Sequence, residues 1–480
     1  MWNLRTLALT CITGCTSIFA FEPCHFEVRL EHAIASDTAR AGDVVRARVL
    51  ADPVDDGSGA CALPPDAAIT GRVKRVKRVG FGFRRERASL ELEFDTLLAD
   101  GRRQPIDAQL AEVSNARETV DRKGVVRGVL AADSNLQMQN GLWLRLRPNA
   151  TMLRRVATGL TGLAGIASNG FGEHPVLAGS IIAARVMLVR MAEPEIRLPA
   201  GTELVLQANE APALPAPAAP PATADGSWAE WVVAQPAGTA KKGDAPAGDL
   251  INLALRGSRH DVESAFAAAG WLPTDPLNKK NALRLFQAHS RKGPYPTAPV
   301  SPLYYEGRLP DAVFQKSFNT VAKRHHIRLW QVPNGPGGQP LWLGAATHDV
   351  GLKIDRKTIA NHRIDPEIDG ERRKVVRDLA DARCLAGPVQ LVERPGVRGG
   401  VTDGHEVITD GRVAVLRVNE SGCARPVQAA AGQFRQRSLF CRFVRRTVLE
   451  TRHYLLRSNV YYFGYRLASK FRSPRTLHHL

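Results

Sequence analysis

The pattern of apolar and polar positions divides the chain into a strand-rich segment, a spacer and a segment that mixes helices with strands. Through residues 27–209, apolar and polar residues alternate over short stretches that turn-forming residues separate. Leu90, Leu92 and Phe94, for example, alternate with polar neighbours, which is the period of a strand with one buried face. We therefore expect residues 27–209 to form a β-rich barrel or sandwich.

A spacer follows this segment. Residues 211–224 contain five Pro and seven Ala in fourteen positions. Such a stretch has few amide donors and little apolar surface to bury, so it behaves as an extended, semi-rigid connection. A more charged stretch from Lys241 to Gly248 continues it. We expect a linker over residues 210–247.

Helical signals begin after the linker. Ser258 is suited to cap a helix over Arg259–Ala269, which Gly270 would end. Two more helices are expected, over Asn281–Arg291 and over Glu371–Ala382 with Asp369 as the cap. The expected strands cover Leu250–Leu255, Pro302–Tyr305, Ala312–Ser317, Lys323–Val332 and Pro340–Asp349. Helices followed by runs of strands are typical of an α+β domain, which we place at residues 248–386.

An extension is expected at residues 387–434. Thr409-Asp410-Gly411 is suited to the turn of a β hairpin, with Val413 and Val415 in the returning strand. No GxGxxG or Walker loop is present anywhere in the sequence, which argues against a nucleotide-binding sheet.

The amino terminus has the pattern of a bacterial secretory signal over residues 1–20. A positive charge at Arg5 precedes an uncharged, mostly apolar run that is too short to cross a membrane. Ile12-Thr13-Gly14-Cys15 resembles a lipobox, in which Cys15 would be acylated. Cleavage after Ala20 by an ordinary signal peptidase is the alternative. Either reading predicts export, to the periplasm or the outer membrane of a Gram-negative bacterium.

Export changes what the seven cysteines predict. Cys11 would be lost and Cys15 lost or acylated, which leaves five cysteines as thiols in an oxidising compartment. Bridges between Cys24 and Cys61 and between Cys384 and Cys423 are plausible, although no spacing fixes them, and Cys441 is left over. None has CxxC or zinc-ribbon spacing, which argues against a cysteine metal site.

Positive charge is concentrated at the carboxyl terminus. The chain has 65 Lys or Arg against 47 Asp or Glu, a net charge of +18. Residues 435–480 contain eleven Lys or Arg and a single acidic residue, Glu450, so they carry +10 of it. If residues 440–457 are helical, an apolar side and a basic side result, and Leu449 and Leu456 break the pattern. The apolar side would hold Phe440, Phe443, Val444, Val448, Tyr454 and Leu455, and the basic side Arg442, Arg445, Arg446, Arg452 and Arg457.

Two partners fit this basic amphipathic tail. An anionic membrane surface suits both of its sides, and the aromatic run at residues 461–465 suits headgroup depth. A helix that packs on the protein's own domains, or on an envelope protein partner, is the alternative. Nucleic acid fits poorly, because an exported chain meets little of it and no base-reading module is present.

The second domain resembles the LssY C-terminal domain family. The match runs in order from roughly Gly248 to Ala386. The motifs that carry it are Tyr295–Tyr304 (YPTAPVSPLY), Gly307-Arg308, Phe314-Gln315-Lys316, Arg324–Trp330 (RHHIRLW), Leu341–Thr347 with Asp349, and His362–Asp369 with Glu371-Arg372. Related domains are attached to membrane lipid-phosphatase and DedA-like modules. The resemblance therefore implies a bacterial envelope context.

Within these motifs, five polar residues form a candidate site. His326 and Arg328 share one face of their expected strand, and His348 lies on the next. If the strands pair with matching faces, these three converge, and the loop before the last helix adds His362 and Asp365. Such a group could hold a divalent metal or supply a general base beside an arginine. The alternative is that the histidines only satisfy buried hydrogen bonds and that Asp365 caps the helix entry.

These observations give two hypotheses of function. The first is a non-enzymatic, membrane-associated envelope protein that binds a ligand or a partner. The second is a hydrolase of phosphate- or lipid-like substrates that uses the five candidate residues. No HExxH, GxSxG or Cys-His motif supports the hydrolase, and neither cofactor nor metal can be named from the sequence.

Overall fold

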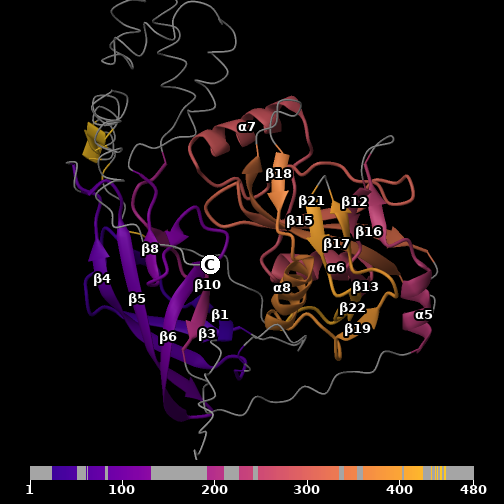
Figure 1. The fold of residues 1–480 in the computed structure, drawn as a ribbon, viewed down its shortest axis with the longest axis horizontal. Helices are drawn as coiled ribbons and strands as arrows, with labels where there is room; N and C mark the ends of the chain where they lie inside the picture. The colour runs from indigo at the N-terminus through magenta and orange to yellow at the C-terminus, as the bar shows by residue number, and fades with distance from the viewer. Residues whose placement is uncertain are drawn as a thin grey trace, which may run out of the picture.

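Two domains lie side by side in the computed structural model of the chain (Figure 1). The predicted signal with Cys15, the spacer at 211–224 and most of the basic tail lie outside the residues that the structure describes. The described residues are 24–50, 61, 63–81, 85–130, 192–209, 226–241, 247–333, 340–353, 361–402 and 405–424, with single residues and pairs between 434 and 449.

The first domain is a closed six-stranded β-barrel. Its strands follow the order β4-β3-β1-β10-β6-β5, and β5 pairs back to β4 to close the ring. β8 and β7 extend from β5, and β2 pairs with β9 separately. The bounds are β1 (Cys24–Leu30), β2 (Ile34–Ala35), β3 (Val44–Val49), β4 (Ala68–Lys77), β5 (Ser89–Ala99), β6 (Arg102–Val113), β7 (Thr119–Val120), β8 (Val125–Arg127), β9 (Arg197–Leu198) and β10 (Glu203–Ala208).

The barrel core comes from the alternation seen in the sequence. Leu90, Leu92 and Phe94 on β5 are buried, as predicted, while polar residues between them face outward. The register of β4 against β5 shifts at Gly71. A Cβ at this position would lie 1.9 Å from the carbonyl oxygen of Glu93, so the approach of the two backbones requires glycine there.

The second domain is built on a mixed sheet with the order β14-β15-β16-β17-β13-β22-β19, and β18 pairs with β17. All pairs are antiparallel except β13 with β22. Its sheet strands are β13 (Leu253–Arg256), β14 (Leu272–Pro273), β15 (Ala312–Lys316), β16 (Arg324–Val332), β17 (Leu341–Lys353), β18 (Asn361–Ile364), β19 (Gln390–Glu393) and β22 (Arg412–Arg417). Two small ribbons accompany it, β11 (Gly238–Ala240) with β12 (Ala247–Leu250), and β20 (Gly399–Thr402) with β21 (His405–Ile408).

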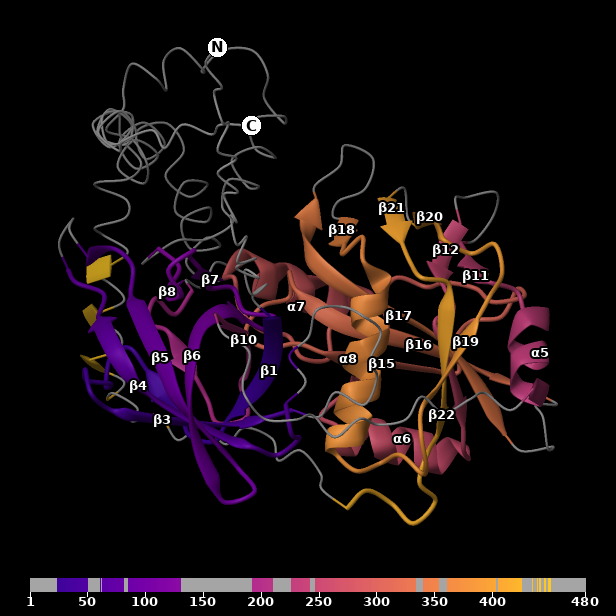
Figure 2. The same cartoon turned by 60° about the horizontal axis from the view of Figure 1, so that its bottom comes forward.

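Helices cover both faces of this sheet (Figure 2). The helices are α5 (Gly226–Ala234), α6 (Arg259–Ala268), α7 (Lys279–Ser290) and α8 (Ile368–Asp381). α6 and α8 bury one face, in a core that includes Phe266, Trp342 and Val376. α5 buries the other face, where Trp228 and Val232 pack with a separate core cluster. The expected combination of a β-barrel and an α+β domain is therefore confirmed.

Helix positions agree with the sequence more closely than helix caps do. Ser258 caps α6 as predicted, and it exchanges hydrogen bonds with Asp261 in a capping box. Asp369 is not the cap of α8, because the helix begins at Ile368 and Asp369 lies in its first turn. Its carboxylate accepts hydrogen bonds from the side chain of Thr409 and the backbone of Asp410 instead.

Two segments differ from the prediction. α5 and β11 lie inside the range expected as linker, 210–247, and α5 packs on the second domain. The predicted hairpin at residues 409–411 is wrong, because β22 pairs with β13 and β19 rather than with β21. β22 is a sheet strand with four buried apolar positions, so its partners are chosen by burial and not by the nearby turn.

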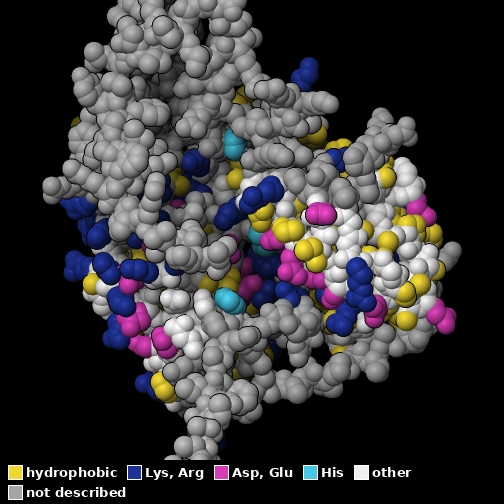
Figure 3. Space-filling model, in the orientation of Figure 1, with side chains coloured by type: hydrophobic (Ala, Val, Ile, Leu, Met, Phe, Trp, Pro, Cys, Tyr) yellow, Lys and Arg dark blue, Asp and Glu magenta, His cyan; other side chains and the backbone are white. Residues whose placement is uncertain are grey.

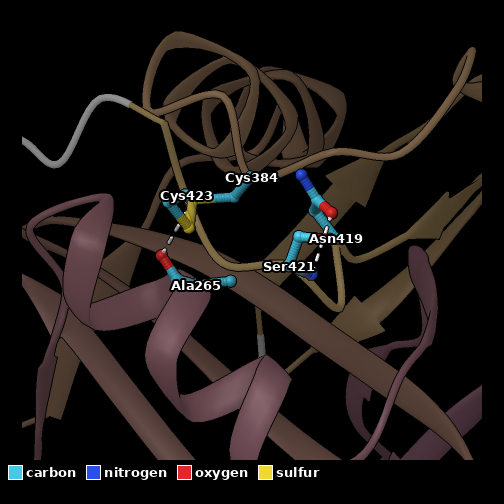
Figure 4. The surroundings of a disulfide bond; sticks show 5 residues. All are labelled: Ala265, Cys384, Asn419, Ser421 and Cys423. Carbon is cyan, nitrogen blue, oxygen red and sulfur yellow. Dashed lines mark hydrogen bonds between the residues drawn. A yellow bond between two sulfur atoms is a disulfide. The ribbon is translucent and has the colours of Figure 1, made fainter.

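Both suggested disulfides are present. Cys24–Cys61 ties the first strand of the barrel to the loop before β4, and Cys384–Cys423 ties the end of α8 to the segment after β22. Figure 4 shows the second bridge, where the sulfur of Cys384 lies 3.6 Å from the carbonyl oxygen of Ala265. Cys441, the fifth cysteine, is free and exposed. Among the described helices, none has the length and apolar character needed to cross a membrane.

Candidate functional site

The register of β16 and β17 decides which candidate residues meet. His325 pairs with His348, and His326 pairs with Thr347. Paired residues project from the same face of a sheet, so His348 lies on the face of His325 and opposite to that of His326 and Arg328. The expected convergence of His326, Arg328 and His348 is therefore wrong.

The two histidines that do meet form a cluster with carboxylates at the domain boundary. The rings of His325 and His348 stack with their centroids 4.4 Å apart. Nδ1 of His325 lies 2.6 Å from Oε2 of Glu371 on α8, and Nδ1 of His348 lies 3.7 Å from Oδ2 of Asp365. Nε2 of His348 lies 2.8 Å from Oδ1 of Asn115, which belongs to the barrel. We call these five residues the histidine-pair cluster.

Burial controls the protonation of the inner half of the cluster. It raises the pKa of Glu371 well above the usual value, and it lowers the pKa of His325 well below its own, with the neighbouring His348 adding to that effect. Both shifts favour neutral forms. When Glu371 holds its proton, it can donate it in a hydrogen bond to Nδ1 of a neutral His325.

The outer half of the cluster is more accessible to solvent. The side chains of His348 and Asp365 are 19% and 38% exposed. The nearby His348 lowers the pKa of Asp365, and burial opposes this effect. Oδ1 of Asp365 also accepts a hydrogen bond from the backbone N–H of Glu367 at 3.1 Å, so part of its role is to shape the entry to α8.

On the opposite face, His326 and Arg328 are buried in a structural network. Nη1 of Arg328 donates to Asp249 at 2.6 Å, and its other nitrogens donate to the carbonyl oxygen of Ser301. Nε2 of His326 lies 2.9 Å from the hydroxyl of Thr347. These bonds tie the proline-rich motif at 295–304 to the sheet. Arg328 and His326 thus both have structural partners on this face of the sheet.

His362 is the remaining candidate. Its backbone pairs with Leu352, four residues beyond His348 on β17, which is about 13 Å along a strand. Its side chain lies outside the described part of the structure. Catalytic roles for His326, Arg328, His348, His362 and Asp365 remain predictions, but these residues do not form a single site.

No metal site is found among the described residues. In that part of the chain, no three His, Cys, Asp or Glu side chains lie together in a way that could hold an ion. The stacking of His325 on His348 gives a reason, since the lone pairs of an imidazole lie in the plane of its ring and cannot point from stacked rings to one ion between them. The histidine-pair cluster is thus better suited to proton exchange and hydrogen bonding than to coordination.

A second group of buried charges, which the sequence did not indicate, joins the domains. Glu203 on β10 of the barrel contacts Arg29 at 2.9 Å, Lys316 at 2.8 Å and Lys374 at 2.9 Å. Burial alone would raise the pKa of Glu203, but the three cations outweigh it and hold that pKa well below the usual range. Lys316 and Lys374 belong to β15 and α8 of the second domain.

The same contact surface continues around Asp381 at the end of α8. Its carboxylate binds Arg29 and Arg48 of the barrel, and Arg377 binds Glu27 at 2.9 Å. Figure 3 shows Lys, Arg, Asp, Glu and His side chains gathered in the crevice between the domains. We call this group, with Glu203 and its three cations, the interdomain charge network. No local pattern could reveal it, because each partner lies far away in the sequence.

The basic tail returns to the barrel. Residues 440, 441, 444, 445, 448 and 449 are helical. Leu449 is buried in the barrel core, and Arg445 pairs with the buried Glu195. Leu449 broke the sequence pattern because it faces the barrel, and Arg445, which was assigned to the basic side, pairs with Glu195 of the barrel domain. For these two residues, the expected alternative of packing on the protein's own domain is confirmed.

Comparison with known proteins finds a family match in the second domain. Residues 234–413 match the model of the family described as LssY C-terminus, a range that covers less than half of the chain. It includes both the histidine-pair strands and α8. A search of the curated proteins finds no relative.

Proposed function

Because residues 234–413 form an LssY C-terminal domain, we propose that the protein is an exported cell-envelope protein that binds the surface of an anionic membrane through its basic tail. The barrel and the LssY domain form one body behind that attachment. In this proposal the protein acts by binding a ligand or a partner at the membrane and not by catalysis.

The two disulfides support export. Disulfides persist in oxidising compartments such as the periplasm and are rare in the cytosol. Both bridges join residues that are about forty positions apart, 37 for Cys24–Cys61 and 39 for Cys384–Cys423. They agree with the secretory signal predicted for residues 1–20.

The observation that carries the membrane proposal is the orientation of the tail helix. One side docks on the barrel through Leu449 and Arg445. Phe440, Val444 and Val448, spaced four residues apart, point away and are 75%, 42% and 40% exposed. Residues at this spacing lie on one face of a helix, so the docked tail presents a row of apolar side chains to the surroundings. We call this row the apolar ridge.

The charge of the sequence around the apolar ridge favours binding to an anionic bilayer. The net charge of residues 435–480 is +10, and each basic residue near such a surface contributes about 1 kcal/mol. Full burial of a Phe or Val side chain contributes roughly 1.5–3 kcal/mol more. An apolar ridge beside a dense positive charge is the composition of an interfacial helix.

The test is sedimentation of the purified protein with vesicles that contain phosphatidylglycerol. Replacing Phe440, Val444 and Val448 with Ser should reduce the bound fraction at least tenfold, because the apolar contribution is lost while every charge is kept. The matched control replaces Leu277, Leu283 and Leu309, which are 62%, 51% and 53% exposed elsewhere on the protein, and should bind as the wild type does.

These point variants are preferable to deletion of the tail, because deletion would also remove Leu449 from the barrel core. Binding by the wild type should fall as salt rises, since it depends on charge. Equal sedimentation of the apolar-ridge variant and the wild type would contradict the proposal.

A further inference from the structure

A cavity of about 260 Å³ lies at the edge of the second domain, on the sheet face that α5 covers. Arg256, Arg417 and Gln390 line it, together with the loop after α8. The described lining contains no acidic residue. Its remaining members are Trp228, Ala386, Gly387, Pro388, Val415 and Leu416.

Strand register brings the two arginines together. Arg256 ends β13 and Arg417 ends β22, and they are partners in the parallel pairing of these strands. Neighbouring strands lie about 4.8 Å apart, so both side chains leave the same face side by side. Two like charges placed this way repel each other. An anion bound between them would turn this repulsion into attraction to both.

The loop after α8 holds the guanidinium group of Arg417 in place through one of its nitrogens, and the other nitrogens can still donate hydrogen bonds. Nε of Arg417 donates to the carbonyl oxygen of Ala386 at 3.0 Å. In the described structure no carboxylate pairs with Arg417, which is exposed at the mouth of the cavity. Gly387, with φ of +90°, has a backbone conformation that favours glycine in this loop.

Gln390 supplies a further polar group. Its Oε1 atom is buried and has no hydrogen-bond partner among the described residues. Gln390 pairs with Val415 on β22, which places its side chain on the face of the two arginines. A buried amide oxygen without a partner carries a desolvation cost, and an anion can remove it only if the amide turns. The amide can turn to present its NH2 group to an anion.

We propose that this cavity binds a phosphate group, either as inorganic phosphate or as the phosphomonoester headgroup of a lipid. Arginine forks match the oxygens of phosphate with two parallel hydrogen bonds each. The cavity is near the lower limit for ligand pockets, about 300 Å³, so it suits a headgroup rather than a large molecule. Trp228, Pro388 and Val415 provide apolar contact for the carbon atoms next to the phosphate.

Calorimetric titration of the full-length mature protein with inorganic phosphate tests the site. Arg256→Gln and Arg417→Gln should each weaken binding at least tenfold. Arg398→Gln is the matched control, since Arg398 is an exposed arginine on the segment after β19, paired with Glu393, and should leave binding unchanged. Thermal unfolding of all three variants verifies that they fold.

Absence of phosphate binding by the wild type, or equal binding by all variants, would overturn the proposal. The source of the phosphate is resolved with vesicles of phosphatidic acid, a monoester, and of phosphatidylglycerol, a diester, using protein that carries the three Ser substitutions in the apolar ridge. A preference for phosphatidic acid that Arg417→Gln removes identifies a lipid headgroup. Phosphate binding without that preference identifies the free ion. Because the apolar ridge is inactivated here, failure of the membrane proposal would not affect this result.

Discussion

Glu371 and His325 form a buried contact in which burial favours the neutral form of both side chains. The raised pKa of Glu371 means that the folded state favours its protonated form. The proton on Glu371 stabilises the fold fully below about 4.3, the pKa of this carboxyl group in the unfolded chain. This contribution is lost as the pH rises through the higher pKa of Glu371 in the folded protein.

Glu371→Gln should therefore stabilise the protein increasingly as the pH rises. Glutamine keeps a donor for Nδ1 of His325 and cannot ionise, so it avoids the cost of a buried charge. The difference in melting temperature between variant and wild type should be near zero at pH 4.5 and positive at pH 8. Calorimetric unfolding across this range measures it. A difference that stays constant with pH would contradict the raised pKa.

Glu203 behaves in the opposite way, because its pKa is lowered by the cations around it. Its contribution is present above the unfolded pKa of about 4.3 and is lost as the pH falls through the lower folded value. Glu203→Gln should cost roughly 3 kcal/mol near neutral pH, the lower end for a broken buried pair, since Lys316, Lys374 and Arg29 each keep a second carboxylate.

Urea unfolding of this variant at pH 7 and pH 4 tests the expectation. The loss should shrink at the lower pH. Glu93→Gln is the control, because Glu93 is 41% exposed and its contact with Arg72 is long, at 3.9 Å, so its loss should be below about 0.5 kcal/mol. A similar loss for both variants would show that Glu203 is not specially placed.

At the scale of elements, the sequence predicts those parts of the fold that depend on local pattern. Alternation of apolar and polar residues predicted β5, and Ser258 predicted the start of α6. Both signals depend only on residues that are neighbours in the sequence. β22 was assigned to the wrong partner, because its turn is local but its pairing with β13 spans some 160 residues.

The prediction of the candidate site failed for the same reason, because it also depended on how strands pair. Histidines at 325 and 326 must face opposite sides, and only the register with β17 determines which of them meets His348. A shift of one residue would have produced the predicted convergence. Glu371 could have been recognised as a buried carboxylate only if the sheet partner of α8 had been known, because Lys374 and Asp378 on the same helix face are also charged. Sequence pattern thus selected His348 and Asp365 of the cluster, but it missed His325, Glu371 and Asn115, which group with them.

At the scale of the whole molecule, the spacer is not what holds the domains together. The interdomain charge network joins them through Glu203 and Asp381, and the tail adds a return contact through Leu449. The hydrogen bond between Asn115 and His348 links the barrel directly to the histidine-pair cluster. The two domains therefore act as one unit.

Cutting the spacer should leave the two halves associated. A protease site placed within residues 211–224 should give fragments that co-elute in gel filtration at 0.15 M salt and separate in urea. The double variant Glu203→Gln with Asp381→Asn should dissociate after the same cut, because both centres of the network are then neutral. Separation of the cut wild type would show that the spacer holds the domains together after all.

The place of β10 in the barrel also decides how the ring closes. β10 lies between β1 and β6, although more than 170 residues separate it from β1. Without β10, the pairings of the other five strands make an open sheet with β1 and β6 at its edges, and free edges of this kind can pair wrongly. We expect closure of the barrel to be a late step in folding, because it waits for a strand from far along the chain.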